Sequence, residues 1–98
     1  MVKYMQFEWD KEKEKQNFLK HGISFSEAEE IFSDEQGIKL KDIKHSEKED
    51  RYFWVGKASD GRVLTTWFVE RDDKIRIIGC AEWRKMRKLY ENAKIERS

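Results

Sequence analysis

The sequence of 98 residues contains no proline and only one cysteine. A lone cysteine excludes an internal disulfide, and Cys80 lies among apolar residues, so we expect a buried core thiol and not a nucleophile. No apolar run approaches the ~20 residues that a membrane span needs, and the first ten residues lack the apolar stretch of a signal peptide. We therefore expect a cytoplasmic protein with no membrane attachment.

Several functional motifs are also missing. There is no nucleophile elbow, phosphate-binding loop or dinucleotide fingerprint, and the two histidines and one cysteine do not have the spacing of metal ligands. We predict neither a metal nor a cofactor. No helix-turn-helix signal is present, so direct DNA binding by this chain alone is not expected.

The length fits a single domain over residues 1–98, and no repeat or linker divides it. Charged residues make up 42% of the chain and hydrophobic residues 38%, a balance that favours disorder when the apolar residues are scattered. Here they are not scattered, because the aromatic residues, 13% of the total, fall in patterned runs. We expect the chain to fold around one core.

The N-terminal half has the pattern of a strand followed by two helices. A strand is predicted over residues 4–9 and a helix over residues 11–21, with Asp10 as its N-cap and Gly22 as its left-handed terminator. The segment Ser24-Phe25-Ser26-Glu27 has capping-box spacing and opens a second helix, whose apolar residues recur at helical spacing.

After Gly37 the apolar pattern changes to strand period, and Asp60-Gly61 is a strong hairpin signal between residues 51–57 and 62–70. In the last strand, alternation predicts one face with Ile75, Ile77 and Gly79 and another with Arg76, Ile78 and Cys80. Helical period returns from Glu82. The resulting order is β-α-α-β-β-β-α, an α+β fold with an antiparallel sheet and helices packed on it.

The charge is concentrated at the C-terminal end. Residues 74–98 carry a net charge of +5, whereas the preceding residues carry −4. Cationic side chains suit phosphates and aromatic rings suit unstacked bases, so this segment predicts single-stranded RNA binding. The candidate residues are Arg76, Trp83, Arg84, Lys85, Arg87, Lys88 and Tyr90. The same pattern also fits a solvated helix face with Trp83 and Tyr90 in the core.

Two further side chains have chemistry that suits a site. His45 lies in a polar loop with acidic neighbours and Arg51, which could orient its imidazole for acid or base work or simply tie it into turn hydrogen bonds. His21 precedes the helix-ending Gly22, where a cationic imidazole suits the helix C-terminus.

Short motifs along nearly the whole chain resemble those of BrnT-type toxins. They are Phe7-Glu8-Trp9-Asp10, Asn17, Lys20-His21-Gly22, Phe25, Ala28, Asp42, His45-Ser46, Glu49, Asp50-Arg51-Tyr52, Gly56, Arg76-Ile77-Ile78 and Tyr90-Glu91. The resemblance implies a metal-independent ribonuclease of the RelE-like fold, neutralised by an antitoxin that binds DNA through a ribbon-helix-helix domain. The chain departs from the family pattern at Gly79-Cys80-Ala81 and at Met86, where many members have Ser-Ala-Arg and a glutamate.

The primary hypothesis is an endoribonuclease toxin in which the 2′-OH of the substrate attacks the adjacent phosphate. Arg76 and Arg84 are assigned to that phosphate, Tyr90 to base stacking or a hydroxyl contact, and His45 to the general base. The RNA-binding residues are Lys85, Lys88, Trp83, Arg87 and Arg51. The alternative is a module that binds RNA or the antitoxin without cleaving RNA.

Overall fold

The computed structural model describes residues 6–97, so Tyr4 and Met5 of the first predicted strand lie outside the described residues. The elements, in chain order, are β1 (Gln6–Trp9), α1 (Lys11–His21), α2 (Phe25–Glu30), η1 (Ile31–Ser33), β2 (Ile38–Lys41), η2 (Ile43–His45), β3 (Arg51–Lys57), β4 (Val63–Arg71), β5 (Lys74–Ala81) and α3 (Arg84–Arg97).

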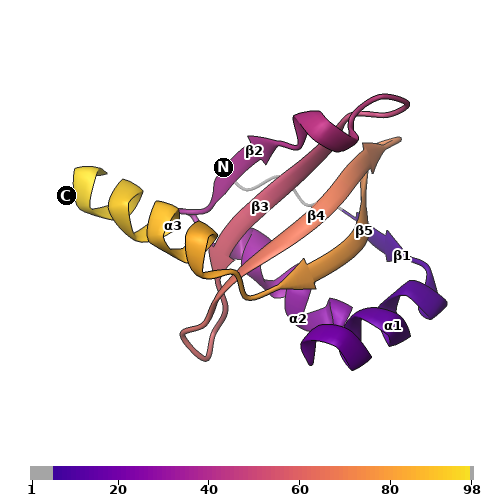
Figure 1. Ribbon diagram of the computed structural model, residues 1–98, viewed down its shortest axis with the longest axis horizontal. Coiled ribbons are helices and arrows are strands. Elements are labelled where there is room, and N and C mark those ends of the chain that lie inside the picture. Colours follow the sequence, from indigo (N-terminus) through magenta and orange to yellow (C-terminus); the bar gives the residue numbers. More distant parts are fainter. Residues whose placement is uncertain (1–5, 98) are drawn as a thin grey trace.

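The strands form one sheet in the order β1-β5-β4-β3-β2 (Figure 1). The α+β class is confirmed, but two details of the prediction were wrong. The sheet has five strands, one more than the predicted order, because the short segment β2 pairs with β3 as an edge strand. The sheet is also mixed, since β1 runs parallel to β5. The chain leaves β1 through two helices and not through a hairpin, so no tight turn forces an antiparallel pair.

The two faces of the sheet are covered differently. Helices α1 and α2 pack against one face, where the main core includes Phe25, Ile31, Leu64 and Phe68. Helix α3 packs on the other face against β3 and β4, but its C-terminal turns project beyond the sheet (Figure 1). It therefore covers only part of that face. No helix within residues 6–97 is long and apolar enough to cross a membrane.

A β-bulge in β5 changes which side chains reach the core. Trp67 pairs with Gly79 and Phe68 pairs with Ile77, so Ile78 is left over between them. An extra residue inverts the alternation beyond it. Cys80 consequently lies in the core with Ile75 and Ile77, and Gly79 lies on the opposite face. The prediction that Cys80 shares the face of Arg76 was wrong, whereas the prediction of a buried thiol is confirmed.

Local signals placed the first helices correctly. The Asp10 carboxylate accepts a hydrogen bond from the backbone N–H of Lys13 at 3.0 Å, and Gly22 ends the helix at φ 71°. The capping box of Ser24 and Glu27 is present. These contacts are local, which is why the sequence pattern sufficed to predict them.

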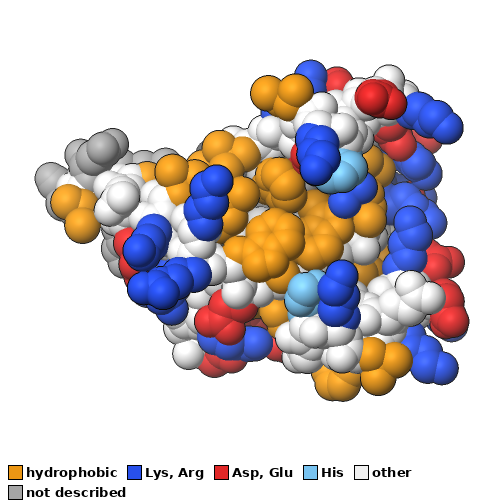
Figure 2. Space-filling view, in the orientation of Figure 1, with side chains coloured by type: hydrophobic (Ala, Val, Ile, Leu, Met, Phe, Trp, Pro, Cys, Tyr) orange, Lys and Arg blue, Asp and Glu red, His pale blue; other side chains and the backbone are white. Residues whose placement is uncertain are grey.

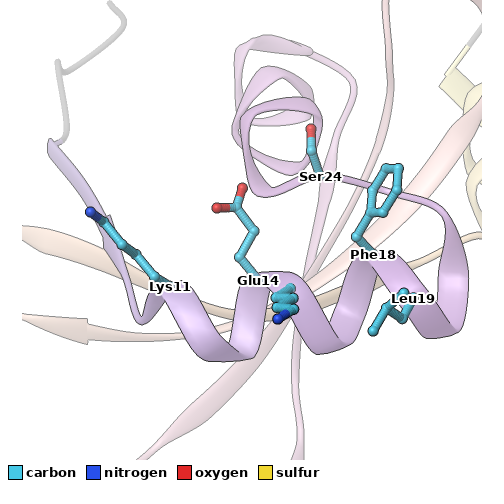
Figure 3. Close-up of a pocket in the computed structure, with 6 residues that line it drawn as sticks. Lys11, Glu14, Phe18, Leu19 and Ser24 are labelled. Carbon is cyan, nitrogen blue, oxygen red and sulfur yellow. The ribbon is translucent and has the colours of Figure 1, made fainter.

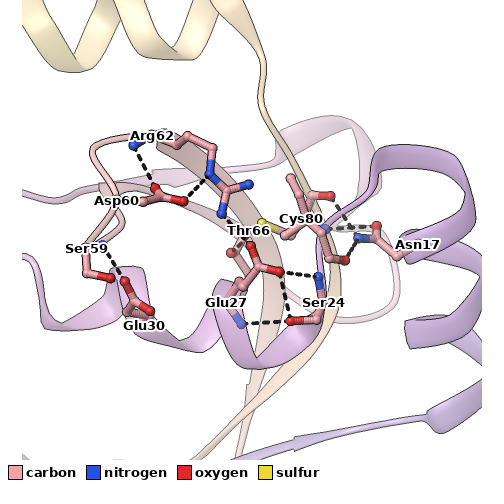
Figure 4. Close-up of polar contacts among 10 residues, drawn as sticks. Asn17, Ser24, Glu27, Glu30, Ser59, Asp60, Arg62, Thr66 and Cys80 are labelled. Carbon is pink, nitrogen blue, oxygen red and sulfur yellow. Dashed lines mark hydrogen bonds and ion pairs between the residues drawn. The ribbon is translucent and has the colours of Figure 1, made fainter.

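Tertiary hydrogen bonds then fasten α1 and α2 to the sheet (Figure 4). The Asn17 side-chain amide donates to the carbonyls of Ile23 at 3.1 Å and Cys80 at 2.9 Å, and its oxygen accepts from the Cys80 N–H at 3.0 Å. Arg62, after the β3–β4 turn, donates to Glu27 of α2. The position of α1 beside β5 is therefore fixed by a buried polar contact.

Candidate functional site

The part of the sheet that α3 leaves uncovered forms a surface that we call the open face. Its centre is an aromatic row of Phe53, Trp67 and Trp83. The rings of Trp67 and Trp83 are stacked, with centroids 4.9 Å apart and an interplanar angle of 3°, and Phe53 meets Trp83 nearly edge-on at 6.1 Å. Figure 2 shows hydrophobic side chains at the centre of this face with cationic side chains around them. Trp83 is 38% exposed, so ring surface remains for another planar group.

Gly79 allows the stack to form. A Cβ at this position would lie 2.2 Å from Cε2 of Trp67, far inside van der Waals contact. Trp67 thus lies close over the backbone of β5 on one side and against Trp83 on the other. The glycine of the Gly79-Cys80-Ala81 segment therefore leaves room for the tryptophan pair.

Two arginines lie on the same face as the aromatic row. Arg51 is opposite Val69, and Val69 is opposite Arg76, so the three residues form one row across β3, β4 and β5. The backbones of the two arginines are two strand spacings apart, about 10 Å. Arg76 Nη1 lies 3.4 Å from a carboxylate oxygen of Glu8, and both side chains remain partly exposed. This row can present two guanidinium groups to an anionic ligand.

His45 is held beside this row by a buried carboxylate. Its Nδ1 lies 3.0 Å from Oδ2 of Asp42, and Nε of Arg51 lies 3.5 Å from the same oxygen. Asp42 is 6% exposed, whereas the His45 side chain is 52% exposed. Because a carboxylate only accepts, the proton of a neutral imidazole lies on Nδ1, and Nε2 is left as an acceptor.

The loop that carries His45 is tied to β3. The Ser46 hydroxyl donates to the Asp42 carbonyl at 2.6 Å and accepts from the backbone N–H of Arg51 at 3.0 Å. The expected turn hydrogen bonds are therefore present in this loop, and the acid–base role of His45 stays a prediction. Asp42, the partner of His45, was not among the predicted site residues. The spacing of three residues between Asp42 and His45 does indicate in the sequence that the two side chains can meet.

The basic residues of α3 lie on a helix that begins directly after Trp83 of the aromatic row. Arg84, Lys85, Arg87 and Lys88 are all exposed. Lys85 and Lys88 border a groove of about 430 Å³ whose other walls are Leu40, Met86, Leu89 and Asn92. The structure thus brings His45, Arg51, Arg76 and Trp83 to the open face and places Lys85 and Lys88 along its border with β2.

Tyr90 does not have the surface position that base stacking requires. It is 3% exposed and packs with Val55 and Val63, and its hydroxyl donates to Oδ2 of Asp34 at 2.6 Å. Burial acts to raise the pKa of Asp34, but the hydrogen bonds from Tyr90 and the Lys57 and Gln36 backbones outweigh it and lower that pKa. This arrangement corrects the predicted role of Tyr90, which instead anchors α3 to the sheet.

The remaining reactive groups contribute little to a site. Burial raises the pKa of the Cys80 thiol to about 11, so it is a poor nucleophile. Within residues 6–97, no group of three or more His, Cys, Asp or Glu side chains is placed to hold a metal ion. The chemistry available on the open face is that of an imidazole, two guanidinium groups and an aromatic stack.

Comparisons with known proteins agree with this fold. The family model described as the ribonuclease toxin BrnT of type II toxin–antitoxin systems matches residues 9–88. The crystal structure of the Brucella abortus ribonuclease toxin BrnT is similar with a TM-score of 0.62 and 20% sequence identity, covering 82% of this chain and 97% of that one. No curated protein matches the chain by sequence.

Proposed function

The chain belongs to the BrnT family of ribonuclease toxins of type II toxin–antitoxin systems, and from that premise we propose that it cleaves RNA on the open face without a metal ion. The observation that carries the proposal is the Asp42–His45 pair beside Arg51, on the same face as the aromatic row. A base, phosphate-binding cations and a stacking surface are what such a cleavage needs.

The proposed reaction is an attack of the 2′-oxygen on the adjacent phosphorus. Nε2 of His45 takes the hydroxyl proton as the O–P bond forms, and the guanidinium groups stabilise the charge that develops on the phosphate oxygens. The bond to the 5′-oxygen then breaks, and that oxygen takes a proton from water. The products are a 2′,3′-cyclic phosphate and a free 5′-hydroxyl.

The other predicted residues position the strand. Arg76 and Arg84 contact the scissile phosphate, with Arg51 beside them, and Trp83 stacks on an unpaired base. Lys85, Arg87 and Lys88 contact flanking phosphates along α3. Tyr90 acts only by holding α3 in place, because its ring and hydroxyl are already engaged.

The partners follow from the same proposal. Membership of a type II family implies a cognate antitoxin. We propose that this antitoxin is a ribbon-helix-helix protein and that operator DNA is bound through it and not by this chain alone. The chain acts as one domain, in the cytoplasm, where its RNA substrate lies.

The direct test is incubation of the purified chain with end-labelled single-stranded RNA in excess EDTA. The wild type should produce fragments with cyclic phosphate ends. Replacing His45 by Ala should slow cleavage about 10²- to 10⁴-fold, as loss of a general base does. The double variant R76A/R84A should also lose activity, whereas K11A/K15A removes two lysines from α1 as a matched control and should cleave normally.

Two results would overturn the proposal. Unchanged cleavage by folded H45A and R76A/R84A would exclude the open face as the site. RNA that is retarded in a gel without new ends would favour the binding module over the enzyme.

A further inference from the structure

Helix α1 and the sheet enclose a hollow beside the aromatic row. Its volume is about 260 Å³, and Trp67 and Ile78 form its sheet side. The α1 side consists of Lys13, Gln16, Asn17, Lys20 and His21. Ile78 is the bulged residue of β5, so the same irregularity that turns Gly79 under Trp67 also shapes this hollow. The hollow is continuous with the aromatic row through Trp67 and was not predicted from the sequence.

The hollow is electropositive. No Asp or Glu lines it, and neither Lys13 nor Lys20 forms an ion pair with a described residue. The two lysines are seven residues apart, about 10 Å along one side of the helix. They can therefore contact two phosphates on either side of one nucleotide, whereas a single small anion would not reach both.

The hollow also offers neutral hydrogen-bonding groups. The His21 ring meets Trp67 edge-on, with centroids 6.2 Å apart and an interplanar angle of 87°. Burial, and then the charge of Lys20, lower the pKa of His21, so the imidazole is neutral at pH 7 and not the helix-end cation expected from the sequence. A neutral imidazole and the Gln16 amide can each donate and accept, as recognition of a base edge requires.

The back of the hollow is rigid. Asn17 makes three hydrogen bonds to the backbones of Ile23 and Cys80 and is buried, so it contributes shape and not free hydrogen-bonding capacity. Because this residue fixes α1 relative to β5, the lysines are held at a constant distance from the aromatic row. A preorganised site loses less entropy when a flexible strand binds.

We propose that this hollow is a second RNA subsite, which holds a nucleotide beyond the Trp67–Trp83 stack, with its flanking phosphates on Lys13 and Lys20 and its base edge against His21 and Gln16. The inference rests on the proposed function, because it extends the RNA path from the open face onto α1. The bound strand thus spans the sheet from the His45 loop to α1.

Helix α1 supplies its own control surface. A second hollow lies on the other side of the helix and is lined by Lys11, Glu14, Lys15, Phe18, Leu19 and Ser24 (Figure 3). It has two lysines, but it also has the carboxylate of Glu14, and it has no contact with the aromatic row. Removing Lys11 and Lys15 therefore changes the net charge as much as removing Lys13 and Lys20 without touching the proposed subsite.

The test measures binding of a fluorescent 2′-fluoro oligoribonucleotide, which lacks the nucleophilic hydroxyl and is not cleaved, over a series of salt concentrations. K13A/K20A should weaken binding about tenfold and lower the slope of log affinity against log salt by about 1.4, since each lost phosphate contact to a single strand contributes about 0.7. K11A/K15A should retain the wild-type affinity and slope. H21A/Q16A should weaken binding with the slope unchanged, because it removes no net charge at pH 7.

The other outcomes would contradict the subsite alone or the subsite together with the proposed function. If K13A/K20A behaves like K11A/K15A while R76A/R84A weakens binding, the subsite is wrong and the proposed function stands. If the wild type does not bind the oligonucleotide, both fail. If K13A/K20A weakens binding of the cognate antitoxin but not of RNA, the hollow is a protein interface and the inference is overturned. Circular dichroism of every variant checks that the fold is retained.

Discussion

Asp42 is the carboxylate on which the proposed proton transfer depends. It is buried, accepts from Nδ1 of His45 and lies close to Arg51. The residue touches no substrate in the proposed reaction. Its role is to fix the ring orientation and the tautomer that leaves Nε2 free to take a proton.

Replacing Asp42 by Asn should therefore impair turnover more than binding. The asparagine amide can donate to Nδ1, which places the imidazole proton on Nε2, where it blocks base catalysis. We expect kcat to fall about 10²-fold or more with KM nearly unchanged. Steady-state kinetics on a fluorogenic RNA measure both constants. A rise in KM as large as the fall in kcat, or a rate that follows only the folded fraction of the protein, would show a merely structural role.

Tyr90 and Asp34 form a second pair, whose role is in stability. Removing the hydroxyl with Tyr90→Phe should cost about 2 kcal/mol at pH 7, as expected for a hydrogen bond to a charged group. The pKa of Asp34 is lowered in the folded state, so this contribution is present above its unfolded pKa and disappears as the pH falls through the lower folded value. Urea unfolding at pH 7 and at pH 3 measures the difference. An equal loss at both pH values would contradict the pairing.

At the scale of elements, β5 does more than complete the sheet. Its bulge turns Cys80 into the core, where Asn17 holds it, and turns Gly79 under the Trp67 ring. One extra residue thus couples the attachment of α1 to the geometry of the aromatic row.

Gly79→Ala should break the tryptophan stack. The added Cβ would lie 2.2 Å from Trp67, so the ring must move and we expect a loss of about 1 to 3 kcal/mol in stability, as in overpacked cores. The near-ultraviolet circular dichroism of the stacked pair should weaken together with RNA affinity. Gly61→Ala is the control, because its φ of 94° is strained but no atom lies within 4 Å of the added carbon. An unchanged spectrum in G79A would contradict the close approach.

The elements were predictable to the extent that their signals are local. Caps at Asp10, Gly22 and Ser24 and the Asp60-Gly61 turn lie within a few residues of the structure they specify. The bulge, by contrast, is a mismatch of register between two strands, and strict alternation within one strand cannot reveal it. The parallel pairing of β1 with β5 could not be predicted either, because it joins residues far apart in the sequence.

At the scale of the whole molecule, ion pairing as well as sequence position decides which cationic side chains are available to a ligand. The net charge is only +1, and Arg62 and Arg71 are paired with carboxylates away from the aromatic row. The exposed cations of α3 and the lysines of the α1 hollow are not paired with described residues. Binding of a polyanion should therefore be local to the open face and its borders.

The fold should be labile to acid. Hydrogen bonds lower the pKa values of five carboxyl groups in the folded state. The Arg62 side chain lowers the pKa of Glu27 and its backbone N–H that of Asp60, while the Ser59 backbone lowers the pKa of Glu30 and Arg71 that of Glu49. For Asp34, the hydrogen bonds from Tyr90 and from backbone groups lower the pKa although burial acts to raise it. A lowered folded-state pKa stabilises the fold above the unfolded value, so we expect Tm to fall as the pH drops below about 4. Differential scanning calorimetry measures this. A Tm independent of pH between 5 and 2.5 would contradict it, and E27Q should reduce the slope.

The sequence by itself determined the α+β class, the helix caps and the buried thiol, because propensity, capping and hydrophobic period act between near neighbours. It also indicated His45, Arg51, Arg76 and Trp83 individually. Only the tertiary structure decided that these side chains share one face with Phe53 and Trp67, that Tyr90 is buried, and that His21 lines a hollow. Those facts depend on strand register, on one bulge and on the uncovered part of a sheet, which are set by contacts between distant residues.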